Sequence, residues 1–386
     1  MQRKAFTAAV LAASVGMSGV AMAAMDSEMK PKVYGQLHVA LEDYDYENDT
    51  GSNLDYDQFR VESYKSRLGV KGKLPISEGF AGIYKVEWEV AVDDGNFGGS
   101  NDGDVFKARE MFGGFETPFG TILMGKHDTP LKDSQGKIDL FNDTQADVGH
   151  TLNGSKTISG EERPSNVIGY ISPKVAETLE FRLFAIQGEE GRCDDAADDC
   201  DDSIGDGISA SVVFGQENMH IGLGYDNGVE GDGGNYLSLT TPAENIDYDR
   251  IRATFGLDLE FLRLGVLAQV AELNSDSESE LERRGGGAGY TDPVSDETSF
   301  MVSVGIPVGD ILFKAQYAMA EYEEEQNSTT KRDHDRTATA VGVDFNFSEQ
   351  SKLFLDYVMQ ESETDDGTTK YEVTEDILAL GFLHKF

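Results

Sequence analysis

Apolar and polar side chains alternate along most of this chain with a period of two, which is the pattern of half-buried β-strands. In residues 80–92, Phe80 and Tyr84 share one face of the predicted strand, and Lys85 and Glu87 share the other. Applied along the chain, the pattern predicts sixteen strands, near 32–42, 58–73, 80–92, 106–115, 121–127, 165–172, 179–187, 208–214, 219–227, 248–257, 262–273, 298–306, 311–321, 337–345, 351–360 and 375–386.

The connections between these strands alternate between short and long. The short ones are 74–79, 116–120, 173–178, 215–218, 258–261, 307–310 and 346–350. The long ones are 43–57, 93–105, 128–164, 188–207, 228–247, 274–297, 322–336 and 361–374. Short turns at one rim and long loops at the other predict an all-β, membrane-spanning antiparallel barrel, because a soluble β-sandwich has no reason to produce this asymmetry. A barrel of about sixteen strands encloses an aqueous channel.

The first residues carry the features of a secretory signal peptide. Arg3 and Lys4 precede an uncharged apolar stretch, which ends in the small-residue pattern Ala-Met-Ala at 21–23. We therefore predict a signal peptide at 1–23 and one barrel domain at 24–386. A helical membrane anchor is the alternative, and the glycines and serines of the stretch together with the cleavage pattern disfavour it. After this region no window of about 20 apolar residues exists, so a membrane-spanning chain must use strands.

Charge excludes one class of partner. The formal net charge is −39, and removal of Arg3 and Lys4 with the signal lowers it to −41. Such a surface repels phosphate backbones, which excludes nucleic-acid binding. Acidity of this degree can also indicate disorder, but 21 Phe and 15 Tyr are more aromatic residues than a disordered chain would carry.

The acidic residues concentrate in the predicted long loops. Loop 188–207 holds nine carboxylates and one arginine, and it contains both cysteines, Cys193 and Cys200. In an oxidising compartment this spacing predicts a small loop disulfide. A two-cysteine metal site is the alternative, but no histidine lies nearby to complete it.

The longest connection is 128–164. Long loops without secondary structure are uncommon and usually functional, so we predict that this loop folds into the barrel and narrows it. Its candidate constriction acids are Asp133, Asp139, Asp143 and Asp147. Inward positions on the second to fifth predicted strands supply a group of cations that we call the basic wall. These are Lys65, Arg67, Lys71, Lys85, Arg109 and Lys126. An acidic loop opposite a basic wall predicts a charged constriction with a transverse field. The simpler interpretation is that these cations only solvate a wet lumen.

Taken in order, several segments resemble the general porins of Gram-negative bacteria, the trimeric sixteen-stranded type. They are VYG at 33–35, SRLGVKG at 66–72, REMFGGF at 109–115, FGTILMGK at 119–126, RPSNVIGYISP at 163–173 and GFLHKF at 381–386. The resemblance covers the mature chain. It implies an outer-membrane location, a homotrimer, a third loop folded inward as the constriction, and passive diffusion of small solutes.

The resemblance also implies roles for particular residues. Arg67, Arg109 and Arg163 match the pore-region arginines of the family, and Lys126 stands where the family usually has arginine. That difference keeps the charge but loses the planar fork of a guanidinium. Phe386 resembles the C-terminal signal that the barrel-insertion machinery reads.

The leading functional hypothesis is a non-enzymatic channel for ions and small hydrophilic solutes, with a cation preference set by its acidic loops. One alternative is a barrel lipase, but the six histidines are scattered and show no serine partner in the sequence. Another is a structural or binding barrel whose acidic loops hold Ca²⁺ or bridge to lipopolysaccharide. No cofactor is expected apart from such Ca²⁺, and a chelator that lowers thermal stability would indicate a real site.

Overall fold

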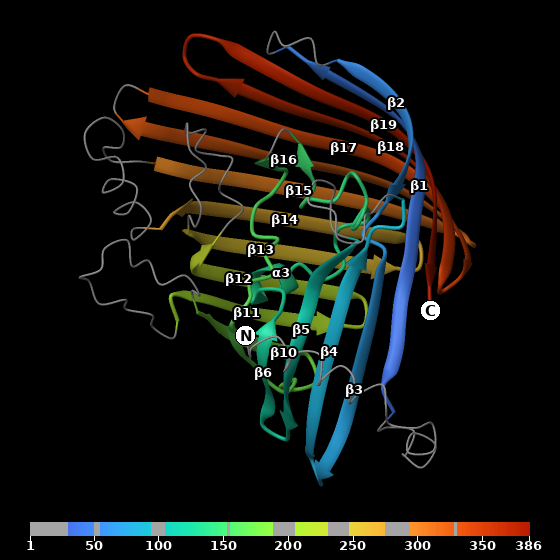
Figure 1. Cartoon of the computed structure of the whole chain (residues 1–386), viewed down its shortest axis with the longest axis vertical. Helices are drawn as coiled ribbons and strands as arrows, with labels where there is room; N and C mark the ends of the chain where they lie inside the picture. Colours follow the sequence, from blue (N-terminus) through green and yellow to red (C-terminus); the bar gives the residue numbers. More distant parts are fainter. Residues whose placement is uncertain are drawn as a thin grey trace, which may run out of the picture.

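One antiparallel sheet closes on itself through the pairing of its first and last strands in this computed structural model, which describes residues 30–49, 55–93, 105–152, 155–187, 205–230, 247–274, 294–327 and 330–386. Strand β1 pairs with β19 along thirteen residue pairs, from Gln36 opposite Lys385 to Asn48 opposite Val373. Figure 1 shows these strands curving round a central space, with α3 inside the curve. The predicted signal peptide at 1–23 and both cysteines lie outside the described residues.

The barrel has sixteen spanning strands, as predicted, because β2 and β3 are successive halves of one strand that both pair with β1. The strands are β1 (Lys32–Asn48), β2 (Tyr56–Ser63), β3 (Arg67–Ser77), β4 (Phe80–Val90), β5 (Phe106–Thr117), β6 (Gly120–Lys126), β9 (Val167–Ile171), β10 (Leu179–Ile186), β11 (Gly207–Gln216), β12 (Met219–Glu230), β13 (Asp247–Leu259), β14 (Leu262–Leu273), β15 (Val294–Val308), β16 (Ile311–Asn327), β17 (Thr330–Ser348), β18 (Ser351–Asp365) and β19 (Lys370–Lys385). No described helix is long and apolar enough to cross a bilayer.

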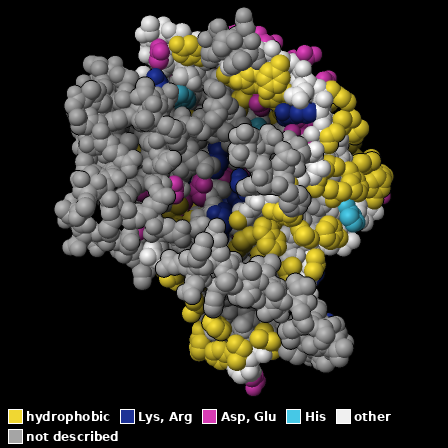
Figure 2. Space-filling view, viewed as in Figure 1, with side chains coloured by type: hydrophobic (Ala, Val, Ile, Leu, Met, Phe, Trp, Pro, Cys, Tyr) yellow, Lys and Arg dark blue, Asp and Glu magenta, His cyan; other side chains and the backbone are white. Residues whose placement is uncertain are grey.

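The predicted alternation of outward apolar and inward polar side chains is observed in the structure, as β16 illustrates. On β16, Phe313 and Tyr317 point outward and are 47% and 37% exposed, whereas Lys314 and Gln316 point inward and are buried. The outward face forms the apolar surface that lipid requires, and the inward face lines the lumen. Yellow hydrophobic side chains on the outer surface and charged side chains in the central hollow show the same division in Figure 2.

Several strands extend further toward the long-loop rim than their apolar pattern predicts. Strand β17 begins at Thr330 and β19 begins at Lys370, where the sequence predicts loops up to 336 and 374. Beyond the apolar band, an outward position faces water, so it can be polar while the backbone ladder continues. The predicted loops 322–336 and 361–374 are therefore mostly strand, and the hydrophobic signal marks the edge of the membrane rather than the end of the strand.

These strand extensions carry a row of outward carboxylates across four strands, above the apolar band. Glu321 on β16 is directly opposite Asp335 on β17, which is opposite Glu363 on β18, which is opposite Glu372 on β19. Like charges directly opposite on neighbouring strands destabilise a sheet. Burial, together with Glu321, Glu363 and Asp333, raises the pKa of Asp335, so its charged form is disfavoured in the folded barrel.

We expect Asp335→Asn to stabilise the barrel at low salt, by about 1 kcal/mol for two relieved like-charge pairs. The raised pKa means that protonation favours the folded state. The wild type should therefore regain this stability below the ordinary carboxyl pKa and lose it as pH rises through the raised value. The gain from the substitution should shrink at acidic pH and in high salt, measured as denaturation midpoints in detergent. Glu217→Gln, at an exposed turn, is the control; an equal gain there would show that only net charge matters.

Candidate functional site: the inner loop and the lumen wall

Residues 128–164, the inner loop, fold into the barrel, as the sequence predicts. The loop leaves β6, forms the short helix α3 (Pro130–Asp133) and the small hairpin of β7 (Thr151–Leu152) and β8 (Ser155–Lys156), and then returns to β9. Thr129 caps α3 by accepting a hydrogen bond from the Lys132 backbone N–H at 3.2 Å, and Pro130 occupies the first helical position. The helix lies against β10, β11 and β12.

Side chains of the barrel wall hold the inner loop through hydrogen bonds to the loop backbone. Side chains from five strands donate hydrogen bonds to successive loop carbonyl oxygens. The pairs are Thr254 to Ser134, Ser303 to Ile138, Lys314 to Leu140, Gln360 to Gln145, Gln316 to Ala146, Arg336 to Leu152 and Arg252 to Ser159. Because a buried carbonyl without a partner is costly, each contact fixes the path of the loop. The loop is therefore a fixed part of the wall from β13 to β18.

Apolar packing completes this attachment. Phe141 and Ala146 of the loop pack with Phe354 and Ile377 of the wall in one buried cluster. In a second cluster, Ile138, Val148 and Ile158 of the loop meet four apolar wall residues, which are Leu267, Met301, Ala318 and Ala338. Burial of this apolar surface inside a wet barrel stabilises the seated loop.

Glycines on β12 to β14 let the loop backbone approach the wall. A Cβ at Gly224 would lie 2.8 Å from the Cα of Leu131, and a Cβ at Gly256 would lie 2.9 Å from the Cγ2 of Ile138. Both separations are too short for real atoms. Only glycine leaves the space that the loop occupies at these positions.

Two cations of the predicted basic wall form ion pairs with predicted acids of the inner loop. Lys65 Nζ lies 3.1 Å from an Asp147 oxygen, and Arg67 pairs with Asp143. The wall strand is interrupted here, between β2 and β3, where Lys65 adopts a left-handed φ of 52°; Asp143 on the loop has a φ of 64°. Left-handed backbone is unfavourable for such residues, so the surrounding contacts must hold it. The interruption brings both cations to the loop.

Asp133 and Asp139 do not face the basic wall, in contrast to the prediction. Asp133 pairs with Arg182 on β10, on the far side of the loop. Asp139 turns into the loop itself, where its oxygens accept from the Phe141 and Val148 backbone N–H groups at 2.8 and 3.1 Å. The constriction acids that meet the predicted cations are therefore Asp143 and Asp147.

The pKa values of two buried loop carboxylates, Asp139 and Asp147, shift in opposite directions. Burial, with the nearby Asp147 charge, raises the pKa of Asp139. Burial opposes the shift at Asp147, but Lys65 and the backbone N–H groups of Asp143 and Gly149 hold the pKa of Asp147 below its usual range. Lys65 therefore pairs with the loop carboxylate whose charged form is favoured, Asp147.

Two further cations of the basic wall, Arg109 and Lys85, are interleaved with wall carboxylates that were not among the predicted site residues. Arg109 contacts Glu87 at 2.9 Å and Glu89 at 3.0 Å, and Lys85 pairs with Glu110. A β-bulge in β5 brings Glu110 to this side of the wall. Val86 is opposite Met111 while Trp88 is opposite Ala108, so β5 has one residue more than β4 in this stretch. The extra residue puts both Arg109 and its neighbour Glu110 on the lumen side, which strict alternation forbids. This sector is a mosaic of both charges rather than a basic wall.

Two more of the predicted cations lie where β6 meets the inner loop. Arg163 pairs with Asp128 at 2.7 Å, and Lys126 Nζ reaches the Ser165 hydroxyl at 3.4 Å. The charged groups on the wall that the inner loop does not cover keep some contact with solvent. The Lys65 side chain is 39% exposed and that of Glu89 is 29% exposed. Figure 2 shows Lys, Arg, Asp and Glu side chains together in the central hollow. The open passage therefore lies between the loop and strands β3 to β6.

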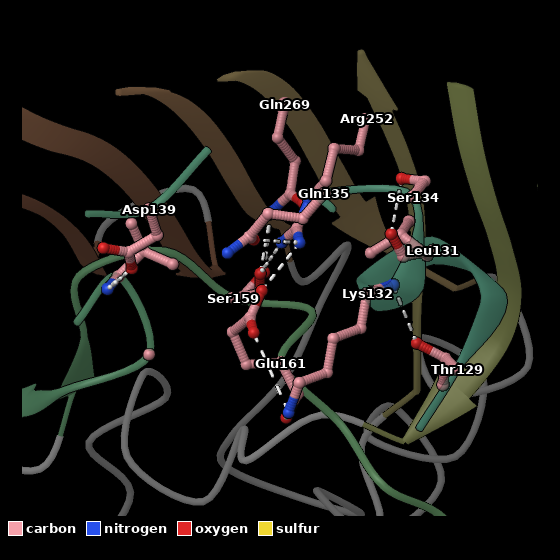
Figure 3. Close-up of polar contacts among 12 residues, drawn as sticks. Thr129, Leu131, Lys132, Ser134, Gln135, Asp139, Ser159, Glu161, Arg252 and Gln269 are labelled. Atoms are coloured by element: carbon pink, nitrogen blue, oxygen red, sulfur yellow. Dashed lines mark hydrogen bonds and ion pairs between the residues drawn. The ribbon is translucent and has the colours of Figure 1, made fainter. Parts of the chain in front are cut away.

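The wall opposite the open passage carries cations that were not predicted. Arg250, Arg252 and Arg336 are the largest fully buried side chains among the described residues, and all lie beneath the loop. Figure 3 shows Arg252 reaching Gln135, Ser159 and Glu161, with Gln269 beside it. The period-two pattern places these arginines on the inward face, so that signal was present in the sequence.

Other predicted residues lie away from the lumen. Phe386 is exposed and closes the barrel seam through two backbone hydrogen bonds with Gly35, each of 3.1 Å. Among the described residues, the carboxylates of Glu361, Glu363 and Glu372 have oxygens within 4.8 Å of one another. Exposed acidic groups often come this close without an ion, and Ca²⁺ binding stays a prediction.

A closed strand barrel with a lipid-compatible outer surface and a wet, charged lumen narrowed by an inner loop defines an outer-membrane channel. The match to known proteins makes the assignment specific. Residues 7–365 match the Gram-negative porin family, and the chain belongs to it. It is an outer-membrane porin that lets small solutes diffuse passively.

Individual relatives are distant in sequence. The major outer membrane protein P.IB of Neisseria sicca is 23% identical over 315 residues, covering 76% of this chain and 78% of that protein. The anion-selective porin from Comamonas acidovorans is 19% identical, with a TM-score of 0.63 over 92% of this chain and 99% of the other. OmpT of Vibrio cholerae, in a trimer form, is 17% identical, with a TM-score of 0.55 over 92% and 99%. These structures share the fold.

Proposed function

We propose that this porin is a homotrimer whose channels prefer cations at low ionic strength. The observation that carries the ion preference is local charge compensation at the constriction. Lys65, Arg67, Lys85, Arg109 and Arg163 each have a carboxylate partner within the lumen. Paired charges produce little field at a distance, so the net charge of −39 and the acidic outer rim decide which ions enter.

The sign of the preference does not follow from the fold. The Comamonas acidovorans protein is anion-selective on a similar barrel. In this chain the row of carboxylates on β16 to β19 stands at the long-loop rim, where solutes from outside arrive. Cations are concentrated there by an unscreened negative potential.

The test is the reversal potential of single channels in a salt gradient across a planar bilayer. We expect cation preference at about 0.1 M salt, where the Debye length is about 10 Å, and little preference at 1 M, where it is about 3 Å. Conductance should appear in steps of three if the protein is a trimer. Anion preference, or a preference that salt leaves unchanged, would refute the proposed mechanism. Single steps without triplets would refute only the trimer.

We also propose that the channel performs no chemistry on its solutes. His38 is packed between the rings of Tyr64 and Phe354, each 5.3 Å away, and His220 is bonded to the Ser134 carbonyl oxygen at 2.7 Å. Among the described residues, one serine hydroxyl is hydrogen-bonded to a histidine ring, Ser351 to His384 at 2.8 Å, and the sequence did not indicate this contact. In the described part of the chain no carboxylate is hydrogen-bonded to His384, so a group to orient this base is missing.

A further inference from the structure

Three lysines stand directly opposite one another on neighbouring strands of the lumen wall. Lys32 on β1 is opposite Lys71 on β3, and Lys71 is opposite Lys85 on β4. Residues opposite each other in an antiparallel ladder have Cα atoms about 5 Å apart and point to the same face. We call these residues the lysine row.

The lysine row faces the lumen, between the constriction and the short-turn rim. Tyr34 lies within it, since Lys71 Nζ is 4.8 Å and Lys85 Nζ 5.9 Å from the centre of its ring. The Tyr34 hydroxyl donates to Glu87 at 2.8 Å, a carboxylate that also holds Arg109. Two ammonium groups of the row therefore lie near the same ring.

The carboxylates near the lysine row are already engaged. Glu87 binds Tyr34 and Arg109, Glu110 pairs with Lys85, and Glu116 pairs with Lys73 at 2.6 Å. Among the residues that the structure describes, Lys32 and Lys71 have no ion-pair partner, and both are exposed to the lumen. Lys85 is compensated by Glu110, whereas the opposed pair Lys32 and Lys71 is not. Like charges directly opposite cost stability, so this uncompensated pair is an unusual feature in a chain that is otherwise rich in carboxylates.

We propose that the lysine row is a binding site for doubly charged oxyanions, such as sulfate, hydrogen phosphate or a small dicarboxylate. Two or three compact ammonium groups on adjacent strands can donate charge-assisted hydrogen bonds to one dianion. A single halide ion gains only part of this attraction. The proposal rests on the proposed function, because the site is reached through the channel. It adds an anion site on the short-turn side to a channel whose other mouth is acidic.

The experiment measures potassium current through single channels at about 0.1 M potassium while sulfate replaces chloride at constant potassium concentration. We expect sulfate to reduce the current in a saturable way, because a bound dianion occupies the passage. Lys71→Gln should raise the half-blocking sulfate concentration about tenfold, which corresponds to ~1.4 kcal/mol of lost attraction. Lys32→Gln is a second variant at the strand end, in case the first folds poorly.

Lys174→Gln is the matched control, since it removes one exposed positive charge from the short-turn rim outside the lysine row. It should leave the sulfate block unchanged. If both row variants and the control behave like wild type, or if sulfate blocks no better than chloride, the site does not exist. A wild-type protein that forms no channel at all would refute the proposed function instead, so the two failures are distinguishable.

Discussion

Replacement of Arg252 by alanine is expected to loosen the inner loop and destabilise the barrel by about 3–5 kcal/mol, the usual cost of removing one partner from a buried ion pair. The guanidinium is fully buried on β13. It donates to Glu161 at 2.6 Å, to the Ser159 carbonyl oxygen at 2.7 Å and to Gln269 at 2.8 Å (Figure 3). Alanine would leave a buried carboxylate and a buried carbonyl without these donors. Denaturation midpoints in detergent and open-channel current noise would both report the change.

Arg263 on the next strand provides the control. Its ion pair with Asp258 is 3.1 Å long, but both side chains are largely exposed, 42% and 63%. Exposed pairs contribute about 0–1 kcal/mol, so Arg263→Ala should change neither the midpoint nor the noise appreciably. Equal effects from the two substitutions would mean that Arg252 does not anchor the loop.

Period-two alternation was sufficient to predict the barrel because the membrane imposes it. Each spanning strand must show lipid an apolar face, so all sixteen strands carry the signal, even β9, which is only five residues long. The signal ends where lipid ends, and β17 shows the consequence. Its residues before Thr337 are polar on both faces, yet they continue the hydrogen-bonded ladder with β16. A hydrophobic pattern carries no information about backbone pairing.

The candidate site was only partly predictable, for reasons that particular residues illustrate. Alternation correctly placed Lys85 and Arg109 on the inward face, but the bulge that adds Glu110 beside them is a backbone feature. The partners of the loop acids depend on how the loop is seated. Asp133 meets Arg182, 49 residues away, and Asp143 meets Arg67, 76 residues away. Composition alone could not show which of these acids pairs with which part of the barrel wall.

The inner loop divides the lumen wall into two sectors with different sequences. Beneath the loop, inward positions on β12 to β18 hold small residues such as Gly222, Ala318 and Ala338, together with buried arginines. Along the open passage, inward positions hold pairs of opposite charge, such as Arg109 and Glu87. Small inward residues in a wide barrel therefore indicate where a loop packs, and paired charges indicate where water passes.

Gly222 tests this division by steric means. A Cβ at this position would lie 3.1 Å from the carbonyl carbon of Ser134 and closer still to its oxygen. Because that neighbour is loop backbone, the loop must move away from β12 if alanine is introduced. Overpacking of this kind costs about 1–3 kcal/mol. The displaced loop moves toward the open passage, so Gly222→Ala is expected to lower single-channel conductance, whereas Arg252→Ala should raise current noise.

Gly215 on β11 is the matched control, because a Cβ there meets nothing within 4 Å. Gly215→Ala should conduct like wild type and denature at the same midpoint. If Gly222→Ala also conducts like wild type, the loop is not packed against β12 in the membrane. If it lowers conductance while Gly215→Ala does not, the missing side chain at position 222 helps to set the width of the channel. A wall residue that touches no solute would then control which solutes pass.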